Sequence, residues 1–145
     1  MRLTVYTDYS LRLLMYLAVK GDNRLATIGE VADAHGIAKN HLTKVAHRLG
    51  LAGYIETVRG KGGGLRLARP AERIGLGEVV RHTEPDMALV PCFDPLRAPC
   101  PIIPACGLRG ALYEARRAFL AVLDRYSLAD LVTRRAELGR LLDVA

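Results

Sequence analysis

The amino-acid sequence predicts a mainly α-helical fold with a small β-wing, in which a winged helix-turn-helix is followed by a long amphipathic helix. Three observations lead to this prediction. Two short amphipathic segments are joined through a glycine between residues 27 and 49, a β-rich hairpin pattern follows at 53–68, and an apolar seam of heptad spacing runs through 108–126. The 145 residues suffice for one ordinary domain, or for a small domain with an extension.

Composition and charge narrow the class of protein. Hydrophobic residues make up 50% of the chain and charged residues 25%, which is typical of a globular, soluble protein. No apolar run approaches the roughly 18–20 residues of a membrane span, and the first residues do not resemble a signal peptide, so we expect a cytoplasmic protein with no membrane partner. The net charge of +6 is concentrated in residues 1–83, which hold 13 Lys and Arg against 7 Asp and Glu, whereas 84–145 hold 8 of each. This basic block is typical of a nucleic-acid-binding protein.

The first expected element is a helix that Thr7 can cap and that ends near residues 20–21. A threonine at the N-cap accepts a hydrogen bond from a backbone N–H of the first turn that has no partner inside the helix. Asp8 lies in this first turn, where the helix dipole favours a carboxylate, and the residues alone assign it no further role. The apolar face is formed by residues at helical spacing, namely Leu11, Leu14, Leu17 and Ala18.

Two short helices joined by a glycine turn form the next unit. Thr27 and Glu30 have the spacing of a capping box, so a helix begins there, and it ends at Gly36, which can adopt the left-handed conformation. A second helix over about 38–49 turns apolar residues inward (Leu42, Val45, Ala46 and Leu49) and leaves a largely basic face outward (Lys39, Asn40, His41, Lys44 and Arg48). The pair predicts a helix-turn-helix, although similar helix pairs also occur in proteins that never touch DNA.

A β-hairpin after the second helix strengthens the prediction. Residues 53–59 and 65–68 are rich in β-formers, and the glycine-rich segment 60–64 between them must turn. No Walker pattern supports a phosphate-binding loop here. A hairpin beside a helix-turn-helix is a wing, which can place arginine in the minor groove while the second helix lies in the major groove. The candidate DNA-binding residues are Thr27, Lys39, Asn40, His41, Lys44, Arg48, Arg59, Lys61, Gly62 and Gly63.

The second half of the chain begins with a turn or short helix at 70–74 and a helix at 76–83, and its main element is a long helix from 108. Its apolar residues step by four and three, the spacing of a coiled-coil seam: Leu108, Leu112, Ala115, Phe119, Val122 and Tyr126. A core helix of a single chain could show the same seam. Little chain remains for it to pack on, so we expect a two-fold homodimer. Ser127 is expected to cap a short helix through Leu131, followed by a helical or frayed tail.

Three cysteines, Cys92, Cys100 and Cys106, lie in a loop that also holds five of the seven prolines. Proline removes backbone donors, so the loop is expected to be irregular. Three thiols cannot all pair within one chain, and the spacing lacks the close cysteine pair of most zinc sites. Wide spacing on such a loop favours an iron–sulphur cluster, with zinc or redox-active thiols and packing cysteines as alternatives.

Several strings along the chain carry a resemblance to a known family. They are Leu3-Thr4, Thr7-Asp8-Tyr9, Asn40-His41-Leu42, Gly53-Tyr54, the stretch 58–67, Thr83-Glu84-Pro85 and Ala129-Asp130-Leu131. In this order they resemble the winged-helix iron–sulphur repressors of the NsrR/IscR type over essentially the whole chain. The resemblance is closest to the nitric-oxide-sensing branch.

The resemblance implies a homodimeric repressor with one 4Fe–4S cluster in each subunit. Cys92, Cys100 and Cys106 would be its thiolate ligands, and Asp8, donated by the partner chain, would be the fourth. A carboxylate is a harder and more exchangeable ligand than a thiolate, which suits an iron that reacts with a small molecule. The first two cysteines are further apart than in many relatives. Relatives with 2Fe–2S clusters use a histidine shortly after the third cysteine, and no histidine follows Cys106, so 4Fe–4S is favoured over 2Fe–2S.

These inferences predict a division into a winged helix-turn-helix domain at 1–83, a cluster-binding loop at 84–107, and a dimerisation helix with a C-terminal tail at 108–145. The expected function is a DNA-binding transcriptional repressor that senses nitric oxide, with cluster nitrosylation releasing double-stranded operator DNA. A regulator of the same fold that reports iron–sulphur or iron status is the alternative. From a different class, a redox protein using its cluster or thiols, or a thiol-based oxidant sensor, remains open. We do not expect an enzyme, because no C-x-x-C, cofactor motif or catalytic constellation is recognisable.

Overall fold

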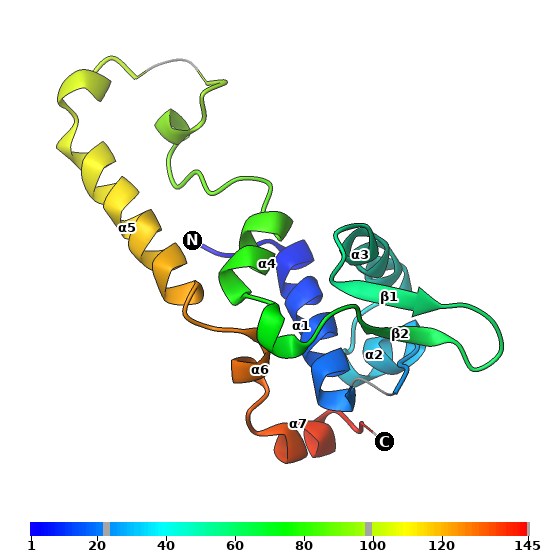
Figure 1. Cartoon of the computed structure of the whole chain (residues 1–145). Helices are drawn as coiled ribbons and strands as arrows, with labels where there is room; N and C mark the ends of the chain where they lie inside the picture. The colour runs from blue at the N-terminus through cyan, green and yellow to red at the C-terminus, as the bar shows by residue number, and fades with distance from the viewer. Residues whose placement is uncertain (22–23, 98–99, 145) are drawn as a thin grey trace.

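The structure, a computed structural model, describes residues 1–21, 24–97 and 100–144, and it is mainly helical with one two-stranded sheet (Figure 1). The winged-helix elements come first, and a long arm and a short C-terminal pair of helices follow. In chain order they are α1 Val5–Lys20, α2 Ile28–His35, α3 Lys39–Leu51, β1 Ile55–Val58, β2 Gly64–Leu67, the 3-10 turn η1 Ala71–Arg73, α4 Leu76–Thr83, the 3-10 turns η2 Pro91–Phe93 and η3 Ile103–Ala105, α5 Gly107–Leu123, α6 Leu128–Leu131 and α7 Arg135–Leu141. Within the described residues, no helix is both long and apolar enough to cross a membrane.

Helix α1 begins earlier than the sequence predicted. Its N-cap is Thr4, whose Oγ1 accepts a hydrogen bond from the Thr7 N–H at 3.2 Å, so the expected cap at Thr7 was wrong. Thr4 has the extended backbone of an N-cap, whereas Thr7 already lies inside the helix and is fully buried. The predicted end is confirmed, because α1 ends at Lys20 and Gly21 leaves the helix with a φ of 95°. Asp8 lies in the first turn, as expected.

The helix-turn-helix is confirmed in detail. Thr27 and Glu30 form the reciprocal capping box at the start of α2, and Gly36 ends the helix in the left-handed conformation with φ 64°. Helix α3 then begins at Lys39 and runs two residues beyond the predicted 49, to Leu51. The residues expected to face inward are all buried, namely Leu42, Val45, Ala46 and Leu49. The polar face of α3 is therefore fixed toward the outside by the burial of its opposite face.

The wing is an antiparallel hairpin in which Ile55 pairs with Leu67 and Val58 pairs with Gly64. Its second strand is also paired on its other edge, since Leu65 exchanges backbone hydrogen bonds with Ala26. This pairing brings backbone close to Gly64, where a Cβ would lie 2.7 Å from the Ala26 carbonyl oxygen. The base of the wing is therefore anchored to the segment that enters α2.

The hydrophobic core lies between α1, α2, α3 and the wing, and the C-terminal helices return to it. Leu128 of α6 and Val132 belong to the same buried cluster as the leucines of α1. Helix α5 behaves differently: all of its residues are described and none is buried. It leaves the body as an arm, seen in yellow and orange in Figure 1. At its C-terminal end the Arg81 guanidinium holds the Asp124 carboxylate with two hydrogen bonds of 2.6 and 2.7 Å.

Candidate nucleic-acid interface and metal centre

The outward face of α3 carries the five side chains that the sequence selected. Lys39, Asn40, His41, Lys44 and Arg48 are all exposed. Asn40 Oδ1 accepts a hydrogen bond of 2.9 Å from the His41 backbone N–H, which leaves the amide nitrogen of Asn40 available to an outside group. The face thus combines positive charge with hydrogen-bond donors, the combination that reads and binds duplex DNA.

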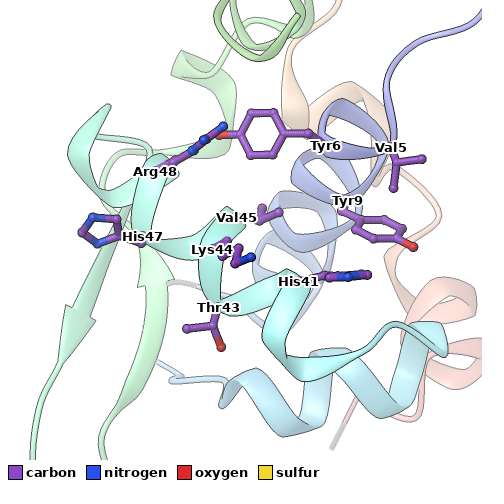
Figure 2. Close-up of a pocket in the computed structure, with 9 residues that line it drawn as sticks. All are labelled: Val5, Tyr6, Tyr9, His41, Thr43, Lys44, Val45, His47 and Arg48. Atoms are coloured by element: carbon purple, nitrogen blue, oxygen red, sulfur yellow. The ribbon is translucent and has the colours of Figure 1, made fainter.

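An open cleft of about 620 Å³ separates the first turns of α1 from this face of α3 (Figure 2). Two contacts bridge it. The Tyr9 ring is stacked on the His41 ring with centroids 6.1 Å apart, and the Arg48 guanidinium carbon lies 5.1 Å from the centroid of the Tyr6 ring. Such contacts keep the charge of Arg48 while fixing the direction of its side chain. The position of α3 is therefore coupled to the start of α1.

The cleft also contains residues that the sequence reasoning did not select. His47 is exposed on α3, one turn after Lys44, and Tyr6 and Tyr9 project from α1 toward α3 (Figure 2). The helical spacing of His47 from Lys44 was a usable signal. No local signal marks the two tyrosines, because their role as a wall of the cleft depends on how α1 packs against α3.

The positive charges at the turn of the wing have no ion-pair partner within the described residues, whereas the arginines of the second strand and just after it are paired. Arg66 is paired with Glu56 across the strands at 2.8 Å, and Arg69 with Glu78 at 2.7 Å. Arg59 and Lys61, in contrast, are exposed and make no ion pair within the described residues. Within the hairpin, the charge without an ion-pair partner among the described residues is therefore at the turn.

The remaining candidates flank these two surfaces. Gly62 is exposed at the turn and Gly63 is partly buried, where a Cβ would lie 2.2 Å from the Val58 carbonyl oxygen. Thr27 is exposed, and its Oγ1 accepts the capping hydrogen bond from the Glu30 N–H at 3.1 Å. Figure 1 places α2, α3 and the wing on one side of the molecule and α5 on the other. All ten candidate DNA-binding residues belong to that side.

The cysteine loop is irregular, as predicted, apart from its 3-10 turns. Cys92 lies in η2, Cys100 precedes η3, and Cys106 is the N-cap residue of α5. The Sγ of Cys106 accepts a hydrogen bond from the Arg109 N–H at 3.4 Å, the kind of contact that supports a cluster thiolate. Each cysteine lies within the described residues, is partly exposed and is free. Of the five loop prolines, Pro99 lies outside the described residues.

The donor set suits a thiolate-held cluster, although this single chain does not gather it. Among residues 1–21, 24–97 and 100–144, no group of three or more His, Cys, Asp or Glu is close enough to hold a metal ion. The loop nevertheless carries three free thiols and no competing disulfide among them. Three sulphur donors leave one position for a ligand from outside the loop. The chemistry of the residues therefore fits an iron–sulphur cluster.

Asp8 is a half-exposed carboxylate that pairs with Arg12 one turn along α1, at 3.0 Å. Exposed pairs of this kind contribute about 0–1 kcal/mol, so the carboxylate can exchange Arg12 for another partner at little cost. Beneath it, burial and the charge of Arg12 lower the pKa of His35, whose Nε2 is buried and has no hydrogen-bond partner within the described residues. The carboxylate of Asp8 is thus the accessible acidic group of this turn.

A contact between distant residues joins α1 to the start of the cysteine loop. Glu84 Oε1 accepts hydrogen bonds from the backbone N–H of Thr4 at 2.8 Å and from its hydroxyl at 3.0 Å. Thr4 is the N-cap of α1, and Glu84 directly follows α4. The first turn of α1 is therefore tied to the point where the loop leaves the body. Sequence reasoning missed this contact, because the two residues lie 80 positions apart.

The chain is similar to known transcriptional regulators over nearly its whole length. The model of the Rrf2 family, described as an iron-dependent transcriptional regulator, matches residues 3–134. The chain is 51% identical over 142 residues to the HTH-type transcriptional regulator NsrR of Bacillus subtilis, covering 98% of this chain and 97% of that protein. It is 49% identical to NsrR of Bacillus licheniformis, covering 98% and 99% of the two chains.

Solved structures agree on the architecture. CymR (YrzC), the global cysteine regulator of B. subtilis, superposes with a TM-score of 0.75 at 23% identity, covering 92% of this chain and 98% of that one. IscR of T. potens gives a TM-score of 0.74 at 21% identity, covering 94% and 90%. At these identities the likeness concerns the fold alone. The predicted fold class, a mainly α-helical winged helix with a small β-wing and a long helix, is confirmed.

Proposed function

Because the chain belongs to the Rrf2 family of transcriptional regulators, we propose that it is a DNA-binding repressor that recognises double-stranded operator DNA through α3 and the wing. The observation that carries this proposal is the uncompensated positive charge on the exposed face of α3 and at the turn of the wing. Lys39, Asn40, His41 and Lys44 face the major groove, where side-chain donors read base edges. Arg59 and Lys61 reach the DNA backbone or the minor groove. Thr27, Arg48, Gly62 and Gly63 lie against the phosphates, which accept hydrogen bonds from hydroxyl, guanidinium and backbone N–H groups.

The repressor acts as a homodimer through α5. The helix is amphipathic, yet none of its fully described residues is buried, and Val122 of the seam remains 43% exposed. An amphipathic helix of this length buries its apolar face against a partner. A second copy of the chain supplies the same seam, and the two-fold pairing places two reading heads on one operator. In this arrangement residues 1–83 bind DNA, 84–107 form the sensor loop, and the seam of 108–126 pairs the subunits.

The sensor is a 4Fe–4S cluster, one in each subunit, held by the thiolates of Cys92, Cys100 and Cys106. Support comes from three free thiols on one loop and from relatives named NsrR. The fourth ligand is Asp8 of the partner subunit, whose carboxylate is accessible and weakly held by Arg12. When bound, the cluster supplies iron that reacts with nitric oxide. Arg12 would give that carboxylate a partner within its own chain whenever Asp8 is not a ligand.

The chain's own contacts carry the signal from the loop to the DNA-binding side. Glu84 at the start of the loop holds Thr4, so a displacement of the loop reaches the first turn of α1. From there the Tyr6–Arg48 and Tyr9–His41 contacts reach α3. A small rotation of α1 therefore changes the orientation of the recognition helix, and the affinity for the operator falls. Coupling of this kind is typically about 1–3 kcal/mol.

A second function has one observation in its favour. The family is described as an iron-dependent transcriptional regulator, which suits a repressor that reports iron or iron–sulphur status through the same cluster. The two functions differ in the signal and share the fold, the ligands and the DNA surface.

The test is operator binding by anaerobically purified protein, titrated with nitric oxide while the absorption spectrum of the cluster is followed. We expect binding to be lost in step with the spectrum. Cys100→Ala should fail to hold the cluster, because the loop has no further thiol, whereas Asp8→Ala should assemble a more labile one. If tight binding persists after the spectrum has collapsed, nitric oxide is not the signal and the iron-status function takes its place.

A further inference from the structure

The guanidinium group of Arg116, on α5, is enclosed by two aromatic rings, one of which belongs to the cysteine loop. Its central carbon lies 4.9 Å from the centroid of Phe93 and 5.0 Å from that of Tyr113. The two rings meet edge to face, with centroids 6.2 Å apart at 82°. Arg116 Nη1 also donates a hydrogen bond to the Met87 carbonyl oxygen at 3.4 Å. We call Arg116, Phe93 and Tyr113 the arginine clamp.

The clamp joins α5 to a loop segment, residues 86–97, whose other side-chain hydrogen bonds and ion pairs are local. In the described part of 86–97, the side-chain hydrogen bonds of Asp86 and Asp94 reach only two residues along the chain, and the ion pair of Arg97 with Asp94 reaches three. Arg116, in contrast, reaches back to the loop from 23 positions beyond Phe93. The clamp therefore holds the segment around Phe93 against α5.

The arginine clamp lies next to Cys92, one of the three cysteines of the loop. Phe93 directly follows Cys92 within η2, so fixing the ring fixes the backbone that carries the first thiol. Arg116 makes no ion pair within the described residues, although α5 and the loop both contain carboxylates.

We propose that Arg116 is a positioning residue for Cys92: through Phe93 it holds this thiol in place on α5 and links the state of the sensor loop to that helix. The part that concerns a cluster rests on the proposed function, whereas the positioning of Cys92 does not. Opening of the clamp increases the exposure of Cys92, which is already partly exposed, and leaves Cys106 in place as the N-cap of α5.

The first experiment uses the reduced, metal-free full-length protein and measures the alkylation rate of each cysteine by mass spectrometry. Arg116→Met keeps much of the aliphatic stem and removes the charge, and Arg117→Met is the matched control on the same helix. Loss of two cation–π contacts should raise the local opening equilibrium, and with it the Cys92 rate, about five- to tenfold. The alkylation rate of Cys106 should stay unchanged. In Arg116→Lys, which keeps the positive charge, the Cys92 rate should lie between those of the wild type and Arg116→Met. Equal Cys92 rates in the two methionine variants would overturn the proposal.

A second variant keeps the test decisive if Arg116→Met disturbs the whole fold, in which case the rates of all three cysteines would rise together. Phe93→Leu removes the ring from the loop side and leaves α5 intact. It should accelerate alkylation of Cys92 alone, by a factor similar to that of Arg116→Met. An unchanged Cys92 rate in a folded Phe93→Leu protein would contradict the clamp.

The iron-loaded protein supplies a separate readout, the rate at which a chelator removes iron. Arg116→Met and Phe93→Leu should lose iron several-fold faster than Arg117→Met, since Cys92 leaves its position more often. If the wild-type chain holds no iron, the proposed function fails, and the alkylation rates still decide the clamp. If the wild type holds iron and the clamp variants match the control in both measurements, the clamp fails while the proposed function stands.

Discussion

Glu30 links the end of α1 to the start of α2, so replacing it should lower stability in a way that depends on pH. Its carboxylate accepts hydrogen bonds from the Lys20 ammonium group and from the Thr27 backbone N–H, and so joins the end of α1 to the start of α2. Lys20 is only 7% exposed, whereas Glu30 is 40% exposed. The hydrogen bonds from Lys20 and Thr27 lower the pKa of Glu30 from 4.5 to about 2.

The size of the effect follows from this shift. A pKa lowered by this much corresponds to about 3 kcal/mol of folding free energy if none of it is screened. Solvent reaches Glu30, so we reduce the expected loss in Glu30→Gln to about 1–2 kcal/mol at pH 7. The melting temperature should fall by about 3–8 °C.

The pH dependence has a definite sign. Because the pKa of Glu30 is lower in the folded chain, its contribution is complete above pH 4.5 and is lost as the pH falls toward about 2. Urea unfolding of wild type and Glu30→Gln between pH 7 and pH 2.5 should therefore give curves that converge at low pH. Glu56→Gln is the control, since Glu56 and Arg66 are 49% and 42% exposed, and should cost less than about 0.5 kcal/mol. Equal losses in the two variants, or a difference at pH 2.5 that is undiminished from pH 7, would refute the reasoning.

Three further predictions concern the wing, the arm and its attachment. Arg59→Ala should weaken operator binding by about 1–3 kcal/mol in fluorescence anisotropy, whereas Arg66→Ala, whose side chain is already paired across the strands, should change it little; equal losses would contradict the wing assignment. Phe119→Asp should give monomers in sedimentation that lose tight operator binding, and a variant that stays dimeric would exclude this seam. Gly77→Ala places a Cβ 2.0 Å from Asp124 Oδ1, so it should lower the melting temperature, and adding Asp124→Ala should cost little more; fully additive losses would rule out a shared contact.

Local sequence signals predicted the helices and the wing because each depends on residues close together in the chain. The capping box of Thr27 and Glu30 and the left-handed turn at Gly36 need only a few neighbours, and both were predicted correctly. The N-cap of α1 was not, since Thr4 and Thr7 are both acceptable caps by local rules. The structure selects Thr4, which Glu84 also holds from a distant part of the chain.

Contacts between segments that lie far apart in the chain were not predicted either, because no local pattern marks them. The pairing of Arg81 with Asp124 and the enclosure of Arg116 by Phe93 depend on the angle at which α5 leaves the body. The burial of Leu128 in the core depends on the chain's return after the arm. For the candidate site, the outward face of α3 followed from its helical period, whereas the cleft beside it required the packing of α1.

The segments just before α4 and just after α5 lie side by side and are joined by backbone hydrogen bonds. The Leu76 N–H donates to the Tyr126 carbonyl oxygen at 2.8 Å, and the Leu128 N–H donates to that of Ile74 at 2.7 Å. The cysteine loop and α5, which follow the core helix α4, therefore form an insertion whose two ends are held close together, and doubling the length of a flexible insertion costs only about 0.6 kcal/mol of closure entropy. Segments of different length can accordingly be accommodated at this place while the helix-turn-helix and the wing keep their core.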